Sequence, residues 1–345
     1  ETAGEGIAIQ IQRKWPPGRA LVLCGPGNNG GDGYVVARRL QEAGWQIDLA
    51  SIADPELLKG DAALMRDQWN GPILSLARAE VADIDLVVDA VFGAGFSRYL
   101  ESDLASFFAR IKRELIPVVA VDMPSGVNGD TGAVDAGAIP AAMTVSFFRA
   151  KPGHFLYPGR AYCGELKIID IGIDADYLEE IDPETHLNDP ELWRDDLPSL
   201  GPEIQKYSRG HAAVVGGGIA STGAARLAAR ASLRAGAGAT TVVSPPSALQ
   251  TYAAALEAVM VIALSEGQAF EDCLRDKRIG TVLVGPGNGV TERTRKFTSI
   301  ALESPANVIL DADGLTVFRD DPDTLFSLIA EKEHGEVVIT PHEAE

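Results

Sequence analysis

Short apolar runs alternate with stretches of helical periodicity through the first half of the chain, the pattern of strands followed by helices. Strands are expected at 19–23, 45–50, 85–92 and 117–122, and helices at 34–40, 55–69 and 101–114. Residues 1–14 show only a weak helical pattern, because Ile7, Ile9 and Ile11 recur at every second position. Strands that alternate with helices predict an α/β fold with a Rossmann-like, doubly wound parallel sheet.

The same alternation returns after residue 205. Strands are expected at 212–215, 240–243, 281–284, 308–310 and 337–339. An Ala-rich helix over 223–235 could be capped by Ser221 or Thr222, and Gly236 and Gly238 would end it. Residues 174–205 are crowded with Asp, Glu and Pro, as connecting segments are. We therefore expect domains at 1–182 and 206–345, joined by a linker at 183–205.

Composition and charge narrow the choice of partners. The chain has 345 residues, with 30 basic and 49 acidic side chains and a net charge of −19. This acidic balance argues against nucleic acid or an anionic membrane as a partner. Cys24, Cys163 and Cys273 show no metal-ligand spacing and predict reduced thiols. With no signal peptide and no apolar run long enough to span a bilayer, these features predict a cytoplasmic protein. Both ends of the sequence look truncated.

The glycine-rich stretch at 24–33, CGPGNNGGDG, lies between a predicted strand and a predicted helix. Glycines let a backbone take left-handed angles and approach a ligand closely, and a helix N-terminus at such a turn suits phosphate. The stretch lacks the Gly-Lys-Ser/Thr ending of a Walker loop. Glycine spacing alone fits a tight turn capped by Asn and Asp equally well.

Polar residues also follow the later strands of the first half. The stretches at 93–98 and 123–132 are glycine-rich, and the strand ends carry Asp89, Asp122 and Ser125. Each carboxylate alone would fit a helix cap. Ligands of doubly wound sheets bind beyond the carboxyl ends of the strands, so three such loops predict one shared pocket.

The string NNGGDG at 28–33 resembles the signature of the YjeF N-terminal family, the NAD(P)H-hydrate epimerases. VDAVFGAG at 88–95 and VDMPSG at 121–126 are similar to that family's second and third motifs, and 147–172 to its closing strands. The resemblance covers about residues 1–175. A helix with which the family begins would precede Glu1 and is missing here.

The resemblance implies a set of site residues. Those that match contacts to the hydrated cofactor are Asn28, Asn29, Gly30, Gly31, Asp32, Gly93, Ala94, Gly95, Phe96, Ser97, Arg98, Tyr99 and Asp122. Asn29, Asp89 and Ser125 match the oxygen ligands of K⁺, and oxygen ligands suit a hard cation. Epimerisation needs a positioned acid/base, for which Asp122 is the first candidate and Asp32 the second. Lys151 and His154 are interpreted as surface or structural residues.

The second half resembles the YjeF C-terminal family, the ribokinase-like NAD(P)H-hydrate dehydratases. The matching pieces are SRGH at 208–211, GGG at 216–218, STGAA at 221–225, GPGNG at 285–289, LDADG at 310–314 and TPHE at 340–343. The resemblance implies hydrate contacts by Ala224, Gly287 or Gly289, and His342, with Asp311 and Asp313 lining the cleft. It also implies ADP or ATP with Mg²⁺. The family's Gly-Thr-Gly-Asp turn, with the catalytic Asp, would lie beyond residue 345, so the resemblance implies that this stretch is only part of that domain.

Together the two resemblances imply a bifunctional repair enzyme for nicotinamide nucleotides. It would interconvert the R and S forms of hydrated NADH and NADPH (NADHX and NADPHX) and dehydrate the S form at the expense of ADP. A homo-oligomer is expected. Two alternatives stay open: a ribokinase-like small-molecule kinase, and a non-catalytic nucleotide-binding or protein-binding module. Retention of Asn29, Asp89, Asp122 and Ser125 favours a working site.

Overall fold

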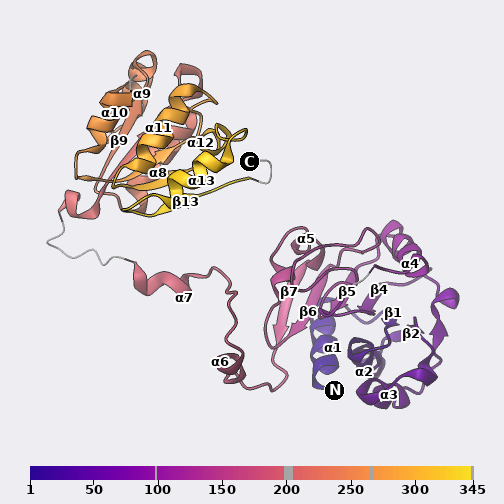
Figure 1. The fold of residues 1–345 in the computed structure, drawn as a ribbon. Coiled ribbons are helices and arrows are strands. Elements are labelled where there is room, and N and C mark those ends of the chain that lie inside the picture. The colour runs from indigo at the N-terminus through magenta and orange to yellow at the C-terminus, as the bar shows by residue number, and fades with distance from the viewer. Residues whose placement is uncertain (98, 198–204, 265–266, 343–345) are drawn as a thin grey trace. The chain divides into compact units, whose positions relative to one another are not determined.

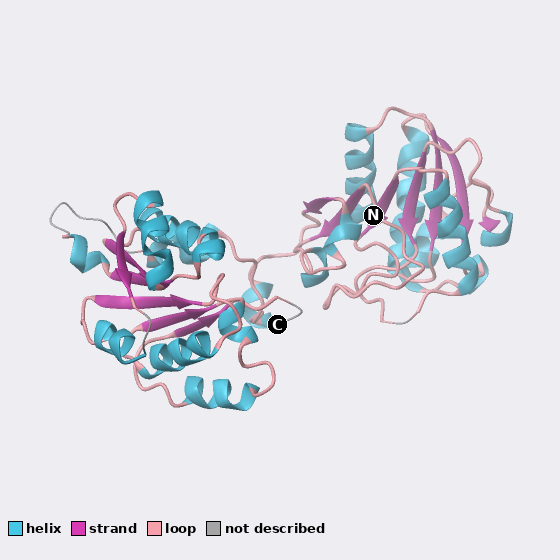
Figure 2. Ribbon diagram, turned by 90° about the horizontal axis from the view of Figure 1, so that it is seen from above, coloured by secondary structure: helices cyan, strands magenta, loops and turns pink. Residues whose placement is uncertain are grey.

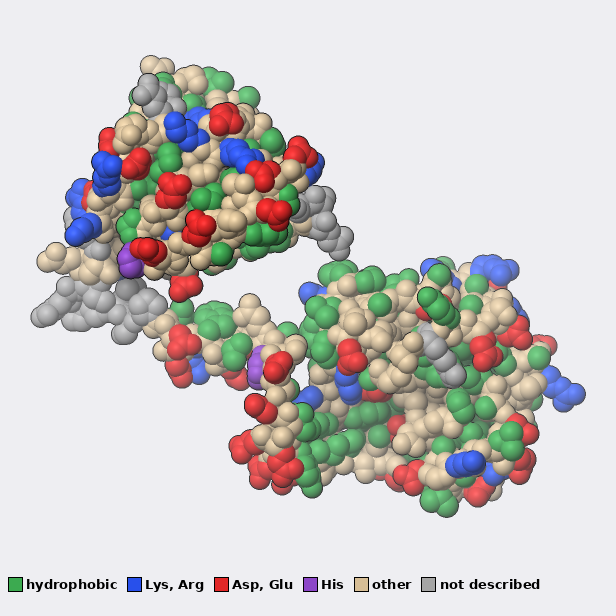
Figure 3. Space-filling model, in the orientation of Figure 1, with side chains coloured by type: hydrophobic (Ala, Val, Ile, Leu, Met, Phe, Trp, Pro, Cys, Tyr) green, Lys and Arg blue, Asp and Glu red, His purple; other side chains and the backbone are tan. Residues whose placement is uncertain are grey.

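The computed structural model describes residues 1–97, 99–197, 205–264 and 267–342. The chain forms two compact units, Glu1–Asp189 and Pro190–Glu345 (Figure 1). The domain limits expected at 182 and 206 stay predictions. None of the helices in the described ranges is long and apolar enough to cross a membrane. Acidic and basic side chains are interspersed on the visible face of each unit (Figure 3).

The first unit is built on a seven-stranded parallel sheet with the order β3-β2-β1-β4-β5-β6-β7. Its strands are β1 Arg19–Cys24, β2 Gln46–Ser51, β3 Leu74–Ser75, β4 Leu86–Ala90, β5 Val118–Val121, β6 Met143–Phe147 and β7 Glu165–Ile169. Its helices are α1 Thr2–Lys14, α2 Asn28–Glu42, α3 Gly60–Asp67, α4 Ser102–Arg113 and α5 Arg160–Cys163. The sheet is doubly wound, because strands are added to opposite sides before and after the return from β3 to β4. This confirms the predicted fold class.

Strand β1 is buried on both faces, as a central strand of a parallel sheet must be. Ala20 and Val22 pack into the core beneath α1 and α2, whereas Leu21 and Leu23 pack into the core beneath α4. Helices therefore cover both faces of the sheet (Figure 2). The continuous apolar run in the sequence follows from this double burial.

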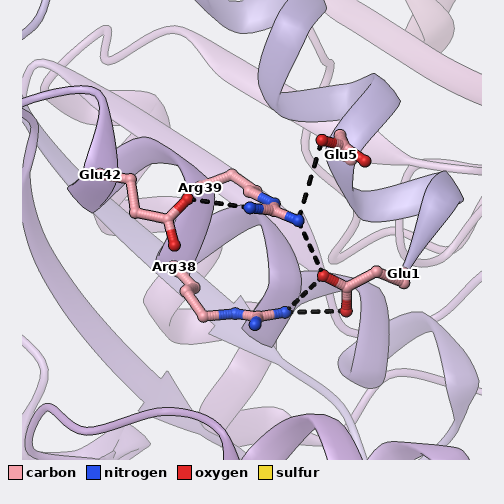
Figure 4. Close-up of polar contacts among 5 residues, drawn as sticks. All are labelled: Glu1, Glu5, Arg38, Arg39 and Glu42. Atoms are coloured by element: carbon pink, nitrogen blue, oxygen red, sulfur yellow. Dashed lines mark hydrogen bonds and ion pairs between the residues drawn. The ribbon is translucent and has the colours of Figure 1, made fainter.

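Helix α1 is regular despite its weak sequence pattern. Ile7 and Ile11 are fully buried one turn apart, and Ile9 is 42% exposed, which breaks the expected periodicity. Arg38 and Arg39 of α2 hold the start of α1 through the Glu1 carboxylate, at N–O distances of 2.7 and 3.0 Å (Figure 4). Apolar packing and surface ion pairs together fix α1 against α2.

Two predicted elements of the first unit were wrong in their limits. The helix expected over 55–69 is a 3₁₀ turn at Pro55–Leu57 followed by α3, because Gly60 has a φ of +57°. The closing strands were expected within 147–172, but β6 begins at Met143 and ends at Phe147, so only β7 lies inside that segment. Strand β6 escaped prediction because Thr144 and Ser146 interrupt its apolar pattern, although both are fully buried.

The second unit is built on a six-stranded parallel sheet with the order β10-β9-β8-β11-β12-β13. Its strands are β8 His211–Val215, β9 Ala239–Ser244, β10 Met260–Ala263, β11 Ile279–Val284, β12 Asn307–Leu310 and β13 Val337–Ile339. Its longer helices are α8 Gly223–Ala235, α9 Leu249–Ala255, α10 Gly267–Leu274, α11 Glu292–Glu303 and α13 Pro322–Ala330, with the short α12 at Asp313–Thr316. This confirms a second α/β unit, although the apolar runs in the sequence did not predict β10.

The ends of α8 match the prediction on one side only. Gly236 ends the helix at a φ of +121°, as expected. Thr222 occupies the N-cap position, but neither its side chain nor that of Ser221 caps the helix. In the connecting segment, α6 Tyr177–Ile181 and α7 Pro190–Trp193 form short helices.

Candidate functional site

The order of strands in the first unit reverses between β1 and β4, which is the place where ligands bind in doubly wound sheets. A cavity of about 750 Å³ opens at the carboxyl ends of these strands. Its lining comprises Pro26, Gly27, Asn28, Asn29, Asp32, Val91, Phe92, Gly93, Ala94, Gly95, Phe96, Ser97, Asp122 and Phe147. The structure therefore brings most of the predicted cofactor contacts, and both candidate acid/base residues, to one cavity.

The glycines of the first motif serve close packing rather than left-handed angles. Helix α2 begins at Asn28, so NNGGDG is its first part and not a loop. No glycine between 25 and 33 has a positive φ. A Cβ on Gly25 would lie 1.9 Å from the Val91 carbonyl oxygen, and one on Gly30 would lie 1.9 Å from the Gly25 carbonyl oxygen. These glycines let α2 start directly against β1 and β4.

The N-terminus of α2 opens into the cavity. Its N-cap residue is Gly27, and no side chain caps it. A Cβ on Gly27 would meet nothing within 4 Å. The first-turn N–H groups of a helix have no intrahelical partners, and with the positive end of the helix dipole they attract an anion. This end of α2 can therefore hold a phosphate group.

Asp122 is held rigidly at the carboxyl end of β5. Its φ is +64°, a left-handed value that is rare for a residue with a side chain. One carboxylate oxygen accepts hydrogen bonds from Lys151 Nζ (2.7 Å) and Ser146 Oγ (2.8 Å), and the other accepts from Ala94 N–H (2.9 Å). Its side chain is only 15% exposed. Burial alone would raise the pKa of Asp122, but the Lys151 ammonium and these hydrogen bonds lower it below its ordinary value. Asp122 is therefore a carboxylate at neutral pH.

Sequence reasoning missed Lys151 and His154 as partners of Asp122. His154 Nδ1 accepts from the Lys151 backbone N–H (2.9 Å), which leaves the proton on Nε2 to be donated to the Asp122 carbonyl oxygen (2.8 Å). Burial lowers the pKa of His154, which favours this neutral form. His154 thus braces the left-handed backbone of Asp122, and Lys151 neutralises its charge. The signal available in the sequence was Lys-Pro-Gly-His shortly after a strand.

Asp32 lies on α2 and lines the same cavity, but its pKa is shifted in the opposite direction to that of Asp122. Burial raises the pKa of Asp32 to about 6, and the negative charge of Asp122 acts in the same direction. Two carboxyl groups whose surroundings drive their pKa values apart can divide the roles of acid and base. Asp122 is suited to accept a proton, and Asp32 is suited to carry one.

Two of the three predicted potassium ligands meet directly. The Asp89 side chain is completely buried and accepts from Ser125 Oγ (2.6 Å) and Ser125 N–H (2.8 Å). Burial raises the pKa of Asp89 to about 6. The side-chain oxygen of the third predicted ligand, Asn29, lies beside Gly93: a Cβ on Gly93 would stand 3.0 Å from it. The Asn29 Nδ2 is buried and has no hydrogen-bond partner among the described residues.

This set of donors fits a hard monovalent cation. The hydrogen bonds that Asp89 receives come from the neutral groups of Ser125 and Val91 N–H, so a buried negative charge is left for a cation to balance. Carboxylate, hydroxyl and carboxamide oxygens suit K⁺. Over the described ranges, three or more His, Cys, Asp or Glu side chains nowhere gather into a metal site. A potassium ion at Asp89 would thus be held mainly by neutral oxygens.

Some predicted contacts lie away from the cavity. Gly30 and Gly31 are buried in the packing of α2, against the Gly25 backbone and Ala62 respectively. Tyr99 is 89% exposed and lines other hollows. Arg98 lies outside the described residues.

In the second unit, the corresponding loops after β8 and β11 are tied together by side chains. Ser221 Oγ donates to the Gly287 carbonyl oxygen (2.8 Å), and Asn288 Nδ2 donates to the Val215 carbonyl oxygen (2.9 Å). Asp313 Oδ2 accepts from Gly289 N–H (2.7 Å). Gly287 and Gly289 therefore lie with Asp313 at the carboxyl ends of adjacent strands.

The remaining predicted contacts of this unit lie on the same edge of the sheet. Ala224 is exposed in the first turn of α8, which follows β8. His342 is exposed after β13. Asp311 directly follows β12, and its carbonyl oxygen would stand 1.7 Å from a Cβ on Gly285. Contact of these residues with a hydrate stays a prediction.

Comparison with known proteins divides the chain in the same way. A family model described as YjeF-related protein N-terminus matches residues 1–153, and one described as NAD(P)H-hydrate dehydratase matches residues 212–345. A crystal structure of a yeast protein covers 55% of this chain and 85% of its own, with 24% identity and a TM-score of 0.44.

Curated relatives align along almost the whole chain. The protein named bifunctional NAD(P)H-hydrate repair enzyme Nnr from Coxiella burnetii is 30% identical over 99% of this chain and 69% of its own length. The protein of the same name from Moorella thermoacetica is 33% identical over 100% of this chain and 69% of its own length. Both alignments span the two units and the segment between them.

Proposed function

Because this chain belongs to the family of bifunctional NAD(P)H-hydrate repair enzymes, we propose that its first unit interconverts the R and S forms of hydrated NADH and NADPH. The observation that carries this proposal is one cavity in which the Asp122 carboxylate, Asp32 and the open N-terminus of α2 converge. Epimerisation at C6 of the hydrated nicotinamide needs proton transfer, and the paired carboxyl groups supply it.

The diphosphate of the hydrate would lie at the N-terminus of α2, and its hydrated nicotinamide would face Asp122. The open space at Gly27 leaves room for phosphate oxygens near the first-turn N–H groups. Gly93 and Gly95 line the cavity beside Asp122 and carry no side chains that would occupy it. A Cβ on Gly93 would stand 2.9 Å from the Asp122 carboxylate, and a Cβ on Gly95 would meet nothing within 4 Å. Small residues at these points let the nicotinamide ring approach the carboxylate.

The proposed reaction is ring opening and closure. Asp122 accepts the proton of the C6 hydroxyl, the C6–N1 bond breaks with its electron pair going to N1, and C6 becomes a carbonyl. Asp32 donates its proton to N1. Reversal of both transfers after rotation of the carbonyl group closes the ring from its other face, so atoms and charge balance. The opposite pKa shifts of the two carboxyl groups support this division of roles.

We propose K⁺ as the resident ion of this unit, held by Asn29, Asp89 and Ser125. When bound, it would balance the buried charge of Asp89 and offer a positive centre to a substrate oxygen. The buried carboxylate of Asp89, which accepts hydrogen bonds from the neutral groups of Ser125 and Val91, supports this assignment.

For the second unit we propose dehydration of the S hydrate with ADP or ATP and Mg²⁺. The family model over 212–345 supports this, and so does the rigid edge formed by Gly287, Gly289 and Asp313. Ala224 and His342 would contact the hydrate from the neighbouring strand ends.

The proposed domain limits are those predicted, 1–182 and 206–345, with a linker at 183–205. We also propose a homo-oligomer and a cytoplasmic location, the latter supported by three free cysteines of which Cys24 and Cys163 are buried.

The test is chiral separation of R and S hydrated NADH after incubation with the chain in potassium buffer. Rapid equilibration that Asp122→Asn abolishes is expected. A chain that binds the hydrate without changing its R/S ratio would instead be a binding module. Phosphorylation of a sugar or vitamin by ATP would instead identify a kinase. Retention of ¹⁸O at C6 is expected for ring opening, whereas full exchange with solvent would indicate loss and return of hydroxide.

A further inference from the structure

A second cavity, of about 470 Å³, lies over the carboxyl ends of β2 and β3. Phe92 lines both this cavity and the candidate site, so the two adjoin. Residues 51–55 and 73–77 form the side toward β2 and β3, and Tyr99, Glu101, Asp103 and Leu104 form the other side. Apart from Tyr99, none of the predicted site residues takes part in its described lining. We call it the β2–β3 cavity.

The lining of the β2–β3 cavity is apolar on its walls and acidic at several points. Ile52, Ile73, Leu74, Leu76 and Leu104 supply aliphatic surface, and Phe92 and Tyr99 supply rings. Asp54, Glu101 and Asp103 supply carboxylates, all on exposed residues. This combination suits a flat heteroaromatic ring joined to a group that carries hydroxyl donors.

We propose that the β2–β3 cavity binds the adenosine half of the hydrated dinucleotide, an inference that rests on the proposed epimerase function. The diphosphate at the N-terminus of α2 would stand at the strand switch point. From there one nucleotide half extends over β4 and β5 toward Asp122, and the other extends over β2 and β3. The apolar walls receive the adenine, and the carboxylates accept hydrogen bonds from the ribose hydroxyls.

The same lining discriminates between the two hydrates. Asp54 stands just beyond β2 and uses one carboxylate oxygen to accept from Glu56 N–H (3.0 Å), at the start of a 3₁₀ turn. The described lining includes three carboxylates and neither lysine nor arginine. A 2′-phosphate would be repelled there, whereas a 2′-hydroxyl would find acceptors. Hydrated NADH is therefore expected to bind more tightly than hydrated NADPH.

The decisive variant is Ala77→Trp, which places a large side chain at an exposed position of the cavity lining, outside the buried core. The matched control is Ala82→Trp, also exposed and outside the lining of both cavities. Each protein is assayed with hydrated NADH and with hydrated reduced nicotinamide mononucleotide, which lacks the adenosine half. Ala77→Trp should raise KM for hydrated NADH about tenfold, the effect of losing one good subsite, and leave the mononucleotide unchanged.

Equal KM values for hydrated NADH in the two variants would overturn the proposal, and so would an equal loss with both substrates. Calorimetric titration with ADP-ribose gives a readout that needs no turnover: Ala77→Trp should weaken the binding that Ala82→Trp preserves. If the wild type never equilibrates R and S hydrates, the proposed function fails, but this titration still decides the ligand of the cavity. Tighter binding of ADP-ribose 2′-phosphate than of ADP-ribose would overturn the assigned ribose contacts.

Discussion

The two units each place a glycine-rich segment beside a central strand, yet the segments differ in backbone and in purpose. Between residues 25 and 33 no glycine has a positive φ, and helix α2 runs through the segment. At 285–289, Gly285, Gly287 and Gly289 have φ values of +129°, +73° and +79°. In the first unit glycine only removes bulk so that backbones touch. In the second unit the left-handed backbone also favours glycine, in addition to the close contact of Gly285 with the Asp311 carbonyl oxygen.

This difference decides what the nearby carboxylates can do. Because α2 needs no side chain to shape its start, Asn29 and Asp32 are free to face the cavity. In the second unit Asp313 accepts the N–H of Gly289 and thereby holds the loop. Under the proposed function, the cavity of the first unit is the site of proton transfer, and the glycine loop of the second unit shapes a ligand surface.

The largest expected effect is loss of epimerase activity in Asp122→Asn. The amide cannot accept the hydroxyl proton, and a positioned acid/base contributes roughly a thousandfold in rate. The initial rate of R/S equilibration measures the loss. Asp130→Asn, an exposed residue on a loop of the same unit, serves as the control and should keep the wild-type rate. A wild-type rate in Asp122→Asn would show that another group acts as the base.

The next effect separates the two uses of glycine. Gly30→Ala should destabilise the first unit by about 3 kcal/mol, because its Cβ would overlap a backbone carbonyl that cannot move aside. Gly287→Ala should cost about 1–2 kcal/mol through its left-handed φ. Urea unfolding measures both. Gly27→Ala is the control: its Cβ meets open space, so stability should hold. Equal losses for Gly27→Ala and Gly30→Ala would contradict the packing argument.

Apolar runs were enough to predict the buried strands β1, β4 and β5, because strands covered on both faces are continuous in hydrophobicity. Strand β6 was missed because two of its buried positions are polar: Thr144 bonds to the Cys163 carbonyl oxygen and Ser146 to Asp122. The hydrogen-bond partners that allow these polar side chains to be buried lie about 20 residues or more away in the sequence. The pattern of apolar and polar residues within the strand therefore does not reveal them.

The candidate site shows the same limit. The motifs predicted Asn29, Asp32 and Asp122 in one cavity, because carboxyl ends of parallel strands share one edge. They did not predict that Lys151 would pair with Asp122, since the two are 29 residues apart and the ion pair depends on how β6 sits beside β5. Similarly, nothing local signalled that His154 would brace the Asp122 backbone.

The pairing of Lys151 and Asp122 predicts a change in pH dependence. The lowered pKa of Asp122 means that its charge stabilises the fold above its ordinary pKa, and that this stability is lost as the pH falls through the lowered value. Lys151→Met removes the cation, so the acid limb of both kcat/KM and stability should move to higher pH. Lys151→Arg should restore the wild-type limb. If Lys151→Met lowered kcat/KM equally at every pH without moving the acid limb, Lys151 would have only a structural role.

Potassium binding predicts a smaller effect on stability. A cation bound only by the folded chain raises the melting temperature, here by about 3 °C for roughly 1 kcal/mol. The comparison is between potassium chloride and tetramethylammonium chloride at equal ionic strength. Asp89→Asn removes the buried charge while keeping the shape, so the difference between the salts should vanish. If Asp89→Asn showed the same difference in melting temperature between the two salts as the wild type, the ion would bind at another site.

The smallest expected effect comes from the ion pairs that join α1 to α2. Arg38 contacts Glu1 at 2.7 Å, but the two side chains are 23% and 41% exposed, so solvent screens their attraction (Figure 4). Arg38→Gln should therefore destabilise the first unit by less than about 1 kcal/mol, and less still at high salt. The R/S equilibration rate should not change, because Arg38 lies outside the lining of the cavity. A large loss of rate in Arg38→Gln would mean that α1 controls the start of α2, and that the site depends on more than the cavity walls.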